Sequence, residues 1–316
     1  MDYIVLDLEW NQADDLKTKR ESRLTFEIIE IGAVKLNSDM AQTGSFHELI
    51  KPQVFNRMNQ VTQELIHISM DELENCRFFR EAAEDFLRWC GDDYIFCTWG
   101  NLDLFELQAN MDFYGMPCLS QNSLKYYDVQ KLFSICFEDK KKRSALQYAV
   151  ELLGIEDGEP FHRADTDAFY AAEVLKKIKK SAFSNYSFDT YRLPASKAEE
   201  INIVFDDYAK YISREFSSKV SAMNDRDVVS TKCFICGSRT RKRVPWFSKN
   251  GKNYYAIMIC PRHGYIKGKI RMKKSVNDRI YVVKNMKQVG MDTVDDIIRK
   301  KNHIRDDRKE RRHREQ

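Results

Sequence analysis

Near the start of the chain lies the stretch Tyr3-Ile4-Val5-Leu6-Asp7-Leu8-Glu9-Trp10, in which apolar residues dominate and Gly and Pro are absent. This composition predicts a buried β-strand. Because strand side chains alternate between faces, Asp7 and Glu9 point to the same side, about 7 Å apart. Two carboxylates there repel each other and lose solvation, so they require a cation between them or protonation of one. An edge strand with a solvated polar side explains the same pair.

The rest of the N-terminal half predicts the fold class. Apolar or β-branched runs predict five strands, at residues 3–10, 28–36, 45–50, 94–99 and 124–129. Apolar residues at helical spacing predict helices at residues 61–68, 78–89, 101–114, 144–153 and 162–179. The first three strands have short connections and form an antiparallel meander. We expect an α/β sheet of about five strands covered by helices.

More carboxylates follow the later strands and helices. Asp103 comes just after the strand at 94–99, at the edge where α/β proteins collect ligands. An Asp at a helix start is also a common cap. Asp167 lies five residues beyond His162, so both can face one site if His162 is on the entry loop. Asp165 is the competing carboxylate, but it falls on another side of the helix, where its charge suits the dipole.

Asp7, Glu9, Asp103 and Asp167 make four oxygen ligands with one histidine, His162, beside them. Oxygen-rich clusters without thiolates favour Mg²⁺ or Mn²⁺ over zinc. Two such ions about 4 Å apart can activate a water and stabilise the leaving oxygen of a phosphodiester. Histidine suits deprotonation of that water near neutral pH, since its unperturbed pKa is about 6.5.

Three separated segments carry a resemblance to one superfamily. They are Asp7-Leu8-Glu9, Trp99-Gly100-Asn101-Leu102-Asp103 and His162-x-Ala164-x-x-Asp167, in this order. The sequence resembles the DEDDh superfamily of 3′-to-5′ exonucleases, which includes proofreading subunits of DNA polymerases, ribonuclease T and oligoribonuclease. Trp10, residues 27–34 and residues 127–133 look closest to a branch with enzymes that trim structured RNA ends and bacterial sporulation-inhibitor relatives.

The resemblance covers residues 1–180, the first expected domain, and implies a ribonuclease H-like fold with a mixed sheet. It implies two Mg²⁺ or Mn²⁺ ions at Asp7, Glu9, Asp103 and Asp167, with His162 as the general base. The implied reaction releases nucleoside 5′-monophosphates from the 3′ end of RNA or single-stranded DNA. A regulatory or nucleic-acid-binding protein without catalysis is the alternative, and the intact set of five residues favours the enzyme.

Residues 181–230 predict a linker followed by one amphipathic helix. Pro194 closes a loop-like segment, and apolar residues recur at helical spacing between Ala198 and Ser218. These apolar residues are Ile201, Val204, Phe205, Tyr208, Tyr211, Ile212 and Phe216. We expect this helix to pack on the exonuclease domain, and binding of a partner protein is the second interpretation.

A second metal motif lies in residues 231–290, at Cys233-Phe234-Ile235-Cys236-Gly237 and Cys260-Pro261-Arg262-His263-Gly264. These Cys-x-x-Cys and Cys-x-x-His knuckles offer four ligands to a tetrahedral zinc ion. With a turn at 249–252 and strands at 254–259, 265–274 and 279–287, the segment resembles a zinc ribbon. We expect one structural Zn²⁺, because four protein ligands leave no open position for catalysis.

Charge is unevenly distributed along the 316 residues. Residues 231–316 contain 25 Lys and Arg against 8 Asp and Glu, a net charge of +17, while the remainder carries −13. A basic module of this kind predicts a polyanionic partner, here nucleic acid, with a docking site for a protein as the alternative. Residues 291–316 are expected to be a basic charged tail, either disordered or a solvated helix.

The composition also bears on the compartment. No apolar run approaches the roughly 18 residues of a membrane helix, and no secretory signal is visible. Five of the eight cysteines are scattered singly and three cluster late, which is unlike a disulfide framework. We therefore expect a cytoplasmic protein with no membrane partner.

Overall fold

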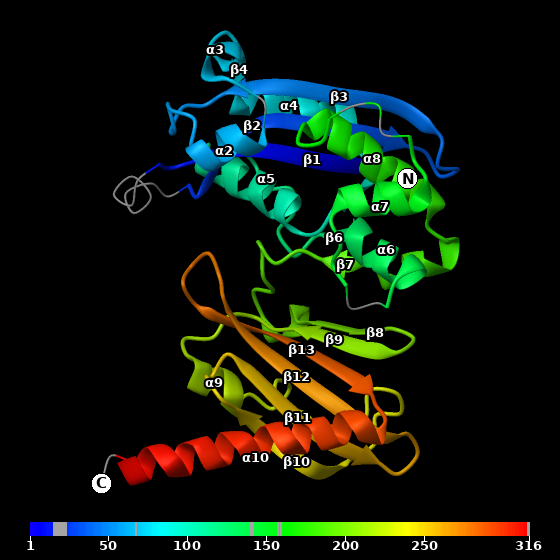
Figure 1. Ribbon diagram of the computed structural model, residues 1–316, viewed down its shortest axis with the longest axis vertical. Helices are drawn as coiled ribbons and strands as arrows, with labels where there is room; N and C mark the ends of the chain where they lie inside the picture. Colours follow the sequence, from blue (N-terminus) through cyan, green and yellow to red (C-terminus); the bar gives the residue numbers. More distant parts are fainter. Residues whose placement is uncertain (15–23, 67, 140–141, 157, 159, 315–316) are drawn as a thin grey trace. The chain divides into compact units, whose positions relative to one another are not determined.

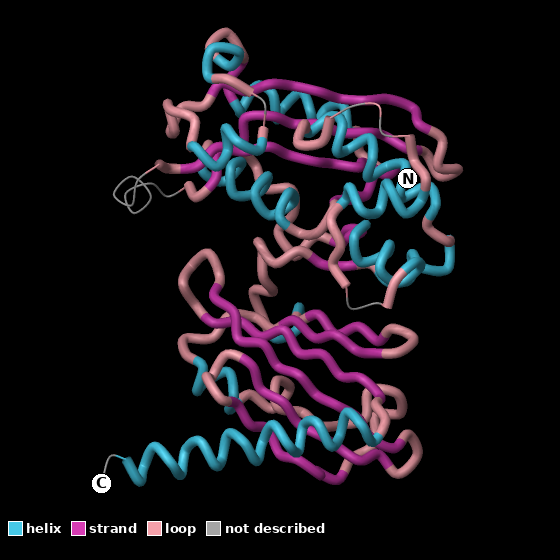
Figure 2. The backbone as a smooth tube through the Cα atoms, in the orientation of Figure 1, coloured by secondary structure: helices cyan, strands magenta, loops and turns pink. Residues whose placement is uncertain are grey.

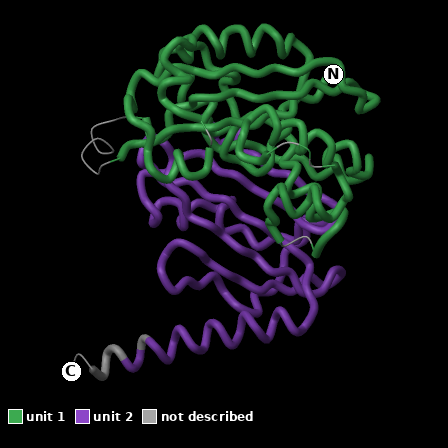
Figure 3. The backbone as a smooth tube through the Cα atoms, turned by 45° about the horizontal axis from the view of Figure 1, so that its top comes forward, with its two compact units in different colours: residues 1–192 green, residues 193–316 purple. Residues whose placement is uncertain are grey.

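The structure is a computed structural model, and it describes residues 1–14, 24–66, 68–139, 142–156, 158 and 160–314. His67 of the helix expected at 61–68 lies outside the described residues. The chain divides into two compact units, residues 1–192 and 193–316 (Figure 3). The boundary therefore falls at Arg192 and not at the expected residues 180 and 230, and residues 193–230 belong to the second unit.

The first unit contains a mixed sheet with the strand order β4-β3-β2-β1-β5-β6-β7 (Figure 1). Its strands are β1 (Asp2–Gln12), β2 (Phe26–Leu36), β3 (Gln42–Lys51), β4 (Arg77–Phe78), β5 (Tyr94–Thr98), β6 (Lys125–Asp128) and β7 (Ser187–Phe188). β1, β2 and β3 form the predicted antiparallel meander, and β5 and β6 continue the sheet in parallel. The predicted α/β fold with about five principal strands is confirmed.

Helices cover both faces of this sheet. They are α2 (Gln60–Leu65), α3 (Met70–Leu73), α4 (Phe79–Cys90), α5 (Leu102–Phe113), α6 (Val129–Phe137), α7 (Leu146–Leu153) and α8 (Ala164–Lys177). Apolar residues of α4 and α5 fill the core on one face, and those of α6, α7 and α8 fill the core on the other. The sequence did not predict α6, which begins where the Asp128 side chain accepts a hydrogen bond from the Lys131 N–H.

β1 lies in the middle of the sheet and contributes to both cores. Ile4, Leu6 and Leu8 pack against the α4 and α5 side, while Val5 packs against the α8 side. Because strand side chains alternate, the odd-numbered Asp7 also belongs to the α8 side. The edge-strand interpretation is wrong, since β1 pairs with β2 and with β5.

Gly32 of β2 determines how closely α8 approaches the sheet. A Cβ atom at this position would lie 2.0 Å from the carbonyl carbon of Ala164, the first residue of α8. No side chain fits in that distance, so only glycine lets the start of α8 rest directly on β2. Asp167, one turn further along α8, is placed by this contact.

The second unit contains an antiparallel sheet with the strand order β10-β11-β12-β13-β9-β8, whose strands are labelled in Figure 1 and magenta in Figure 2. Its strands are β8 (Ile201–Val204), β9 (Tyr208–Ile212), β10 (Arg241–Ser248), β11 (Asn253–Cys260), β12 (Gly264–Lys274) and β13 (Ile280–Gln288). Its α-helices are α9 (Lys219–Asn224) and α10 (Met291–Arg314), and short 3₁₀ helices occur at Lys180–Asn185 in the first unit and Lys197–Glu199 in the second. The strands predicted at 254–259, 265–274 and 279–287 correspond to β11, β12 and β13.

The prediction of an amphipathic helix between Ala198 and Ser218 is wrong. This segment forms the hairpin of β8 and β9, closed where the Phe205 N–H donates to the Tyr208 carbonyl oxygen. β9 pairs with β13, with Ile212 opposite Val283, some seventy residues away in the chain. The segment is rich in β-branched and aromatic residues, and the strand partner that stabilises it lies outside any local window.

The predicted basic tail forms the long helix α10, described as far as Arg314. Val294 and Ile297 near its start are buried against Val244 of β10 and Ile257 of β11. These contacts attach α10 to one face of the sheet in the second unit. Among the described residues, no helix combines the length and apolar character needed to cross a membrane.

We predict that Gly32→Ala destabilises the first unit by about 1–3 kcal/mol or more, because the added methyl group forces α8 away from β2. Urea unfolding followed by tryptophan fluorescence suits the test, since Trp10, Trp89 and Trp99 all lie in this unit. Gly44→Ala is the matched control, because its Cβ would make an ordinary 3.5 Å contact with Trp89. Equal unfolding midpoints for the two variants would show that α8 does not depend on Gly32.

Candidate active site and zinc site

The carboxylates of β1 lie at the carboxyl end of the central strands. β1 pairs with β5 only as far as Leu6 and Thr98, so Asp7 and Glu9 extend beyond the end of β5. Asp103 lies in the first turn of α5, which follows β5, and only 6% of its surface is exposed. Its carboxylate accepts a hydrogen bond from the Leu8 N–H. Asp103 therefore does not cap α5, whose N-cap is Asn101.

His162 and Asp167 approach the same place from the start of α8. His162 precedes the helix with φ of +68°, and its N–H donates to Asp167 Oδ2 over 3.3 Å. One ligand atom each from Glu9, His162 and Asp167 lie within 4.8 Å of one another. Asp7 is close enough to Asp103, Asp167 and Glu9 to be affected by their charges. The structure thus brings together the five residues that the sequence singled out.

Burial and mutual repulsion dominate the electrostatics of this cluster. Burial, followed by the charges of Asp103 and Asp167, raises the pKa of Asp7 well above its ordinary value. Burial is also the main cause that raises the pKa of Glu9 to about 8, of Asp103 to about 7 and of Asp167 to about 6. Without a cation, the cluster therefore favours protonated carboxyl groups over four negative charges.

The donor set fits a hard divalent cation. It consists of carboxylate oxygens and one imidazole, with no thiolate, which suits Mg²⁺ or Mn²⁺. Asp167 Oδ1 is buried and has no hydrogen-bond partner among the described residues, so a ligating atom is left over inside the cluster. Asp165, the competing carboxylate, lies elsewhere, with one oxygen 3.9 Å from His47 Nδ1.

Glu30 of β2 binds the residues that follow His162 at the start of α8. The sequence did not identify this role. The Glu30 side chain is fully buried and accepts hydrogen bonds from Arg163 Nε and Nη2, at 3.0 and 2.9 Å, and from the Ala164 N–H. His47 Nε2 lies 2.7 Å from the same carboxylate. Burial raises the pKa of Glu30, but these hydrogen bonds outweigh burial and keep that pKa below its ordinary value.

Arg163 links this buried anion to the candidate active site. It stands between His162 and Ala164, so its ion pair with Glu30 fixes the chain where it enters α8. Glu30, His47 and Asp165 also lie within 4.8 Å of one another, but the guanidinium of Arg163 already supplies the positive charge there. Glu30 is an ionisable residue inside the apolar run 28–36, which indicates that it needs a buried partner. The sequence could not identify that partner, because Arg163 lies far away in the chain.

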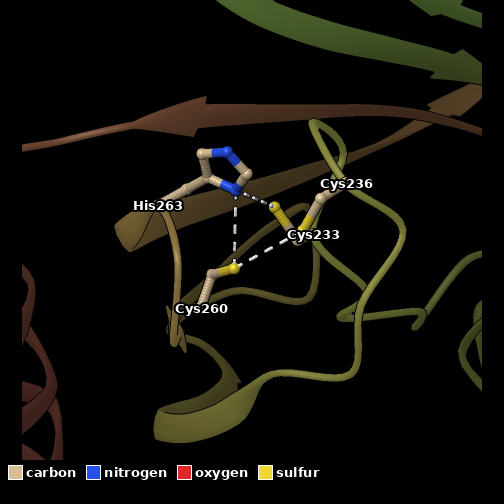
Figure 4. A group of neighbouring side chains, drawn as sticks. All are labelled: Cys233, Cys236, Cys260 and His263. Atoms are coloured by element: carbon tan, nitrogen blue, oxygen red, sulfur yellow. Dashed lines mark hydrogen bonds between the residues drawn. The ribbon is translucent and has the colours of Figure 1, made fainter.

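The four predicted zinc ligands converge in the second unit (Figure 4). Cys233 Sγ and Cys260 Sγ lie 3.5 and 3.6 Å from His263 Nδ1, and Cys236 Sγ lies 3.7 Å from Cys260 Sγ. A tetrahedral zinc ion with usual bond lengths requires S···S distances of about 3.8 Å and S···N distances of about 3.6 Å. The arrangement matches these values, so the residues fit a closed zinc site.

The glycine after each knuckle has a geometric reason. Gly237 and Gly264 both have φ of +69°, a conformation that residues with a Cβ rarely adopt. The Gly237 N–H donates to the Cys233 carbonyl oxygen over 2.8 Å, which closes the first knuckle. The second knuckle connects Cys260, the last residue of β11, to Gly264, the first of β12. One ion at this site would join both connections.

Carboxylate clusters that can hold two divalent metal ions occur in nucleases, among other enzymes. The RNase_T family model, described as exonuclease, matches residues 4–175, more than half of the chain. The chain belongs to this exonuclease family, and the expected resemblance to exonucleases is confirmed. Nucleic acid is accordingly its partner.

Several solved structures resemble the chain in part. The nuclease domain of 3′hExo, a DEDDh family member bound to rAMP, is 20% identical, covers 56% of this chain and 90% of its own, and has a TM-score of 0.47. A 3′-exonuclease that recognises the histone mRNA stem-loop is 17% identical, covers 62% of this chain and 93% of its own, and has a TM-score of 0.47. E. coli Exonuclease I with a dT13 oligonucleotide is 14% identical, covers 57% of this chain and 41% of its own, and has a TM-score of 0.45. A sequence search among curated proteins found no match.

We predict that Asp103→Asn raises the melting temperature of the Mg²⁺-free protein, because it removes one buried negative charge from the cluster. The variant should also lose the stabilisation by added Mg²⁺, which is about 2.7 kcal/mol at 100 times the dissociation constant. Asp165→Asn is the control and should keep that stabilisation. An undiminished Mg²⁺ response of Asp103→Asn in thermal unfolding would remove Asp103 from the set of metal ligands.

We predict one zinc ion per chain in the purified protein, measured by elemental analysis, and none in Cys260→Ala. Since a small metal site rarely stays formed without its ion, chelation should lower the unfolding temperature of the second unit. Cys136→Ala, which removes a half-buried thiol of the first unit, should leave the zinc content unchanged. A wild-type protein that folds fully without zinc would contradict the assignment.

Proposed function

We propose that the chain is a 3′-to-5′ exonuclease that releases nucleoside 5′-monophosphates from RNA or single-stranded DNA. The family supports nuclease activity on nucleic acid. The observation that carries the finer proposal is the convergence of Asp7, Glu9, Asp103 and Asp167 with His162 at one end of the sheet.

In this proposal the four carboxylates hold two Mg²⁺ or Mn²⁺ ions. When bound, such ions activate a water and stabilise the leaving oxygen of a phosphodiester. The buried carboxylates supply the negative charge that retains the cations after the cluster has lost its protons. Hydrogen bonds from the Leu8 N–H to Asp103 and from the His162 N–H to Asp167 orient two of these side chains.

His162 is proposed as the general base. Its side chain is exposed, so water and a substrate strand can reach the ring, and a ring nitrogen lies within 4.8 Å of ligand atoms of Glu9 and Asp167. It accepts the proton of the attacking water and passes it to solvent. Arg163, held by Glu30, keeps the backbone at His162 in its left-handed conformation against β2.

We also propose a structural zinc at Cys233, Cys236, Cys260 and His263, which would hold the two knuckles together. Three thiolates and one imidazole are typical zinc ligands, and the distances between these atoms fit the bond lengths of a tetrahedral zinc ion. We propose the cytoplasm as the compartment, because five of the eight cysteines are scattered singly and the other three belong to the proposed zinc site.

The direct test uses single strands of RNA and of DNA with a label at the 5′ end. With Mg²⁺ or Mn²⁺ the labelled strand should shorten step by step while nucleoside 5′-monophosphates appear, and without these ions it should stay intact. We predict that His162→Ala lowers kcat by about 10²- to 10⁴-fold with little change in KM. His303→Ala, an exposed histidine of α10, is the matched control.

Two outcomes contradict the proposal in different ways. A wild-type protein that binds the strand but never shortens it with either metal would be a nucleic-acid-binding protein without catalysis. A His162→Ala variant with normal kcat and weaker KM would place this histidine in substrate binding and leave the general base unassigned.

A further inference from the structure

One strand of the second unit presents a row of cations on one face of its sheet. Lys267, Lys269, Arg271 and Lys273 occupy alternate positions of β12, so their side chains share a face. We call these four residues the β12 stripe. Its face is the one to which α10 attaches, because Lys267 pairs with Ile257, which packs against Val294 and Ile297. Arg271 and Lys273 are exposed.

The charges of the β12 stripe are uncompensated. Within the described part of the chain, none of its four residues forms an ion pair, although neighbouring Lys274 and Lys287 pair with Asp278 and Asp207. Burial and the like charges of Arg271, Lys267 and Lys300 keep the pKa of Lys269 below its ordinary value. Cations that repel one another and form no internal ion pair favour an external anion.

Aromatic rings lie among these cations. Tyr255 of β11 is directly opposite Lys269 in the sheet, and its ring centroid lies 5.8 Å from Lys269 Nζ and 4.0 Å from Lys300 Nζ. Tyr265 packs on the same face and is only half-buried. Basic side chains interleaved with aromatic rings are the arrangement by which proteins hold single-stranded nucleic acid, with phosphates on the cations and bases on the rings.

The opposite face of the same sheet carries a different kind of surface. A groove of about 900 Å³ there contains exposed cations such as Lys232 and Arg239, but also Glu200 and Asp227. Asp227 pairs with Lys197 at 2.7 Å, and Glu200 pairs with Arg214 at 2.6 Å and accepts the Tyr211 hydroxyl at 2.7 Å. Acidic side chains therefore offset part of the positive charge of this groove.

We propose that the β12 stripe binds the phosphodiester backbone of single-stranded nucleic acid, at a site separate from the carboxylate cluster. Alternate residues of a strand are about 7 Å apart, so the stripe offers a straight, evenly spaced row of charges to a linear polyanion. The inference rests on the proposed function for the identity of its ligand, the strand that the first unit would degrade. Binding itself requires no hydrolysis.

The test compares two double variants of the full chain. Arg271→Gln with Lys273→Gln neutralises two exposed cations of the stripe, and Lys232→Gln with Arg239→Gln neutralises two exposed cations of the opposite face. Fluorescence anisotropy measures binding of a short phosphorothioate single strand, which resists hydrolysis, at several salt concentrations and without a chelator. Each lost phosphate contact makes the slope of log K against log salt shallower by about 0.7 for single strands.

We expect the stripe variant to lose at least tenfold in affinity at low salt and to have a slope shallower by about 1.4, with the control variant unchanged. Equal slopes for the wild type and the stripe variant, or a larger loss in the control variant, would overturn the proposal. So would binding to phosphatidylserine vesicles that exceeds binding to the oligonucleotide and falls in the stripe variant. If the stripe variant loses binding but the wild type never shortens a strand, the proposed function fails and this site stands.

Discussion

The mutual repulsion of buried carboxylates on β1, just beyond the end of β5, is the constraint on which the first unit depends. Asp7 and Glu9 are held there because β1 is paired on both sides and its apolar residues enter both cores. Asp103 adds a third negative charge and is tied to β1 through the Leu8 N–H. A sheet that assembles such charges against their repulsion is organised for cations, because burial gives each carboxylate a strong preference for a proton or a metal ion.

The approach of α8 completes that arrangement, and two contacts outside the cluster control it. Gly32 lets the first residue of α8 rest on β2, and the buried ion pair of Glu30 with Arg163 holds the preceding chain. A buried charge that lost its partner would be strongly destabilising, so these residues constrain the position of His162 and Asp167. Positioning in this unit therefore depends on packing and on an ion pair that lie behind the candidate active site.

The second unit is organised around a cluster of zinc ligands and not around buried carboxylates. Its buried apolar residues form separate clusters on the two faces of the sheet, and its two knuckles converge on one group of three cysteines and a histidine. A metal there would add stability by holding the two knuckles together. The same sheet leaves the β12 stripe uncompensated while salt bridges offset other cations nearby. The repulsion among these like charges destabilises the folded protein. A bound polyanion would neutralise the charges and remove that repulsion.

The sequence by itself determined the elements and residue types whose signals are local. Apolar or β-branched runs marked β1, β2 and β3, and short motifs marked the five residues of the acidic cluster and the four of the zinc cluster. Tertiary structure alone decided the rest, because the partners are distant in the chain. Ile201 to Ile212 became a hairpin because β13 pairs with it, and Glu30 supports the start of α8 because Arg163, distant in the sequence, folds against it. Local patterns record which face of an element is apolar, but only pairing and packing decide what that face meets.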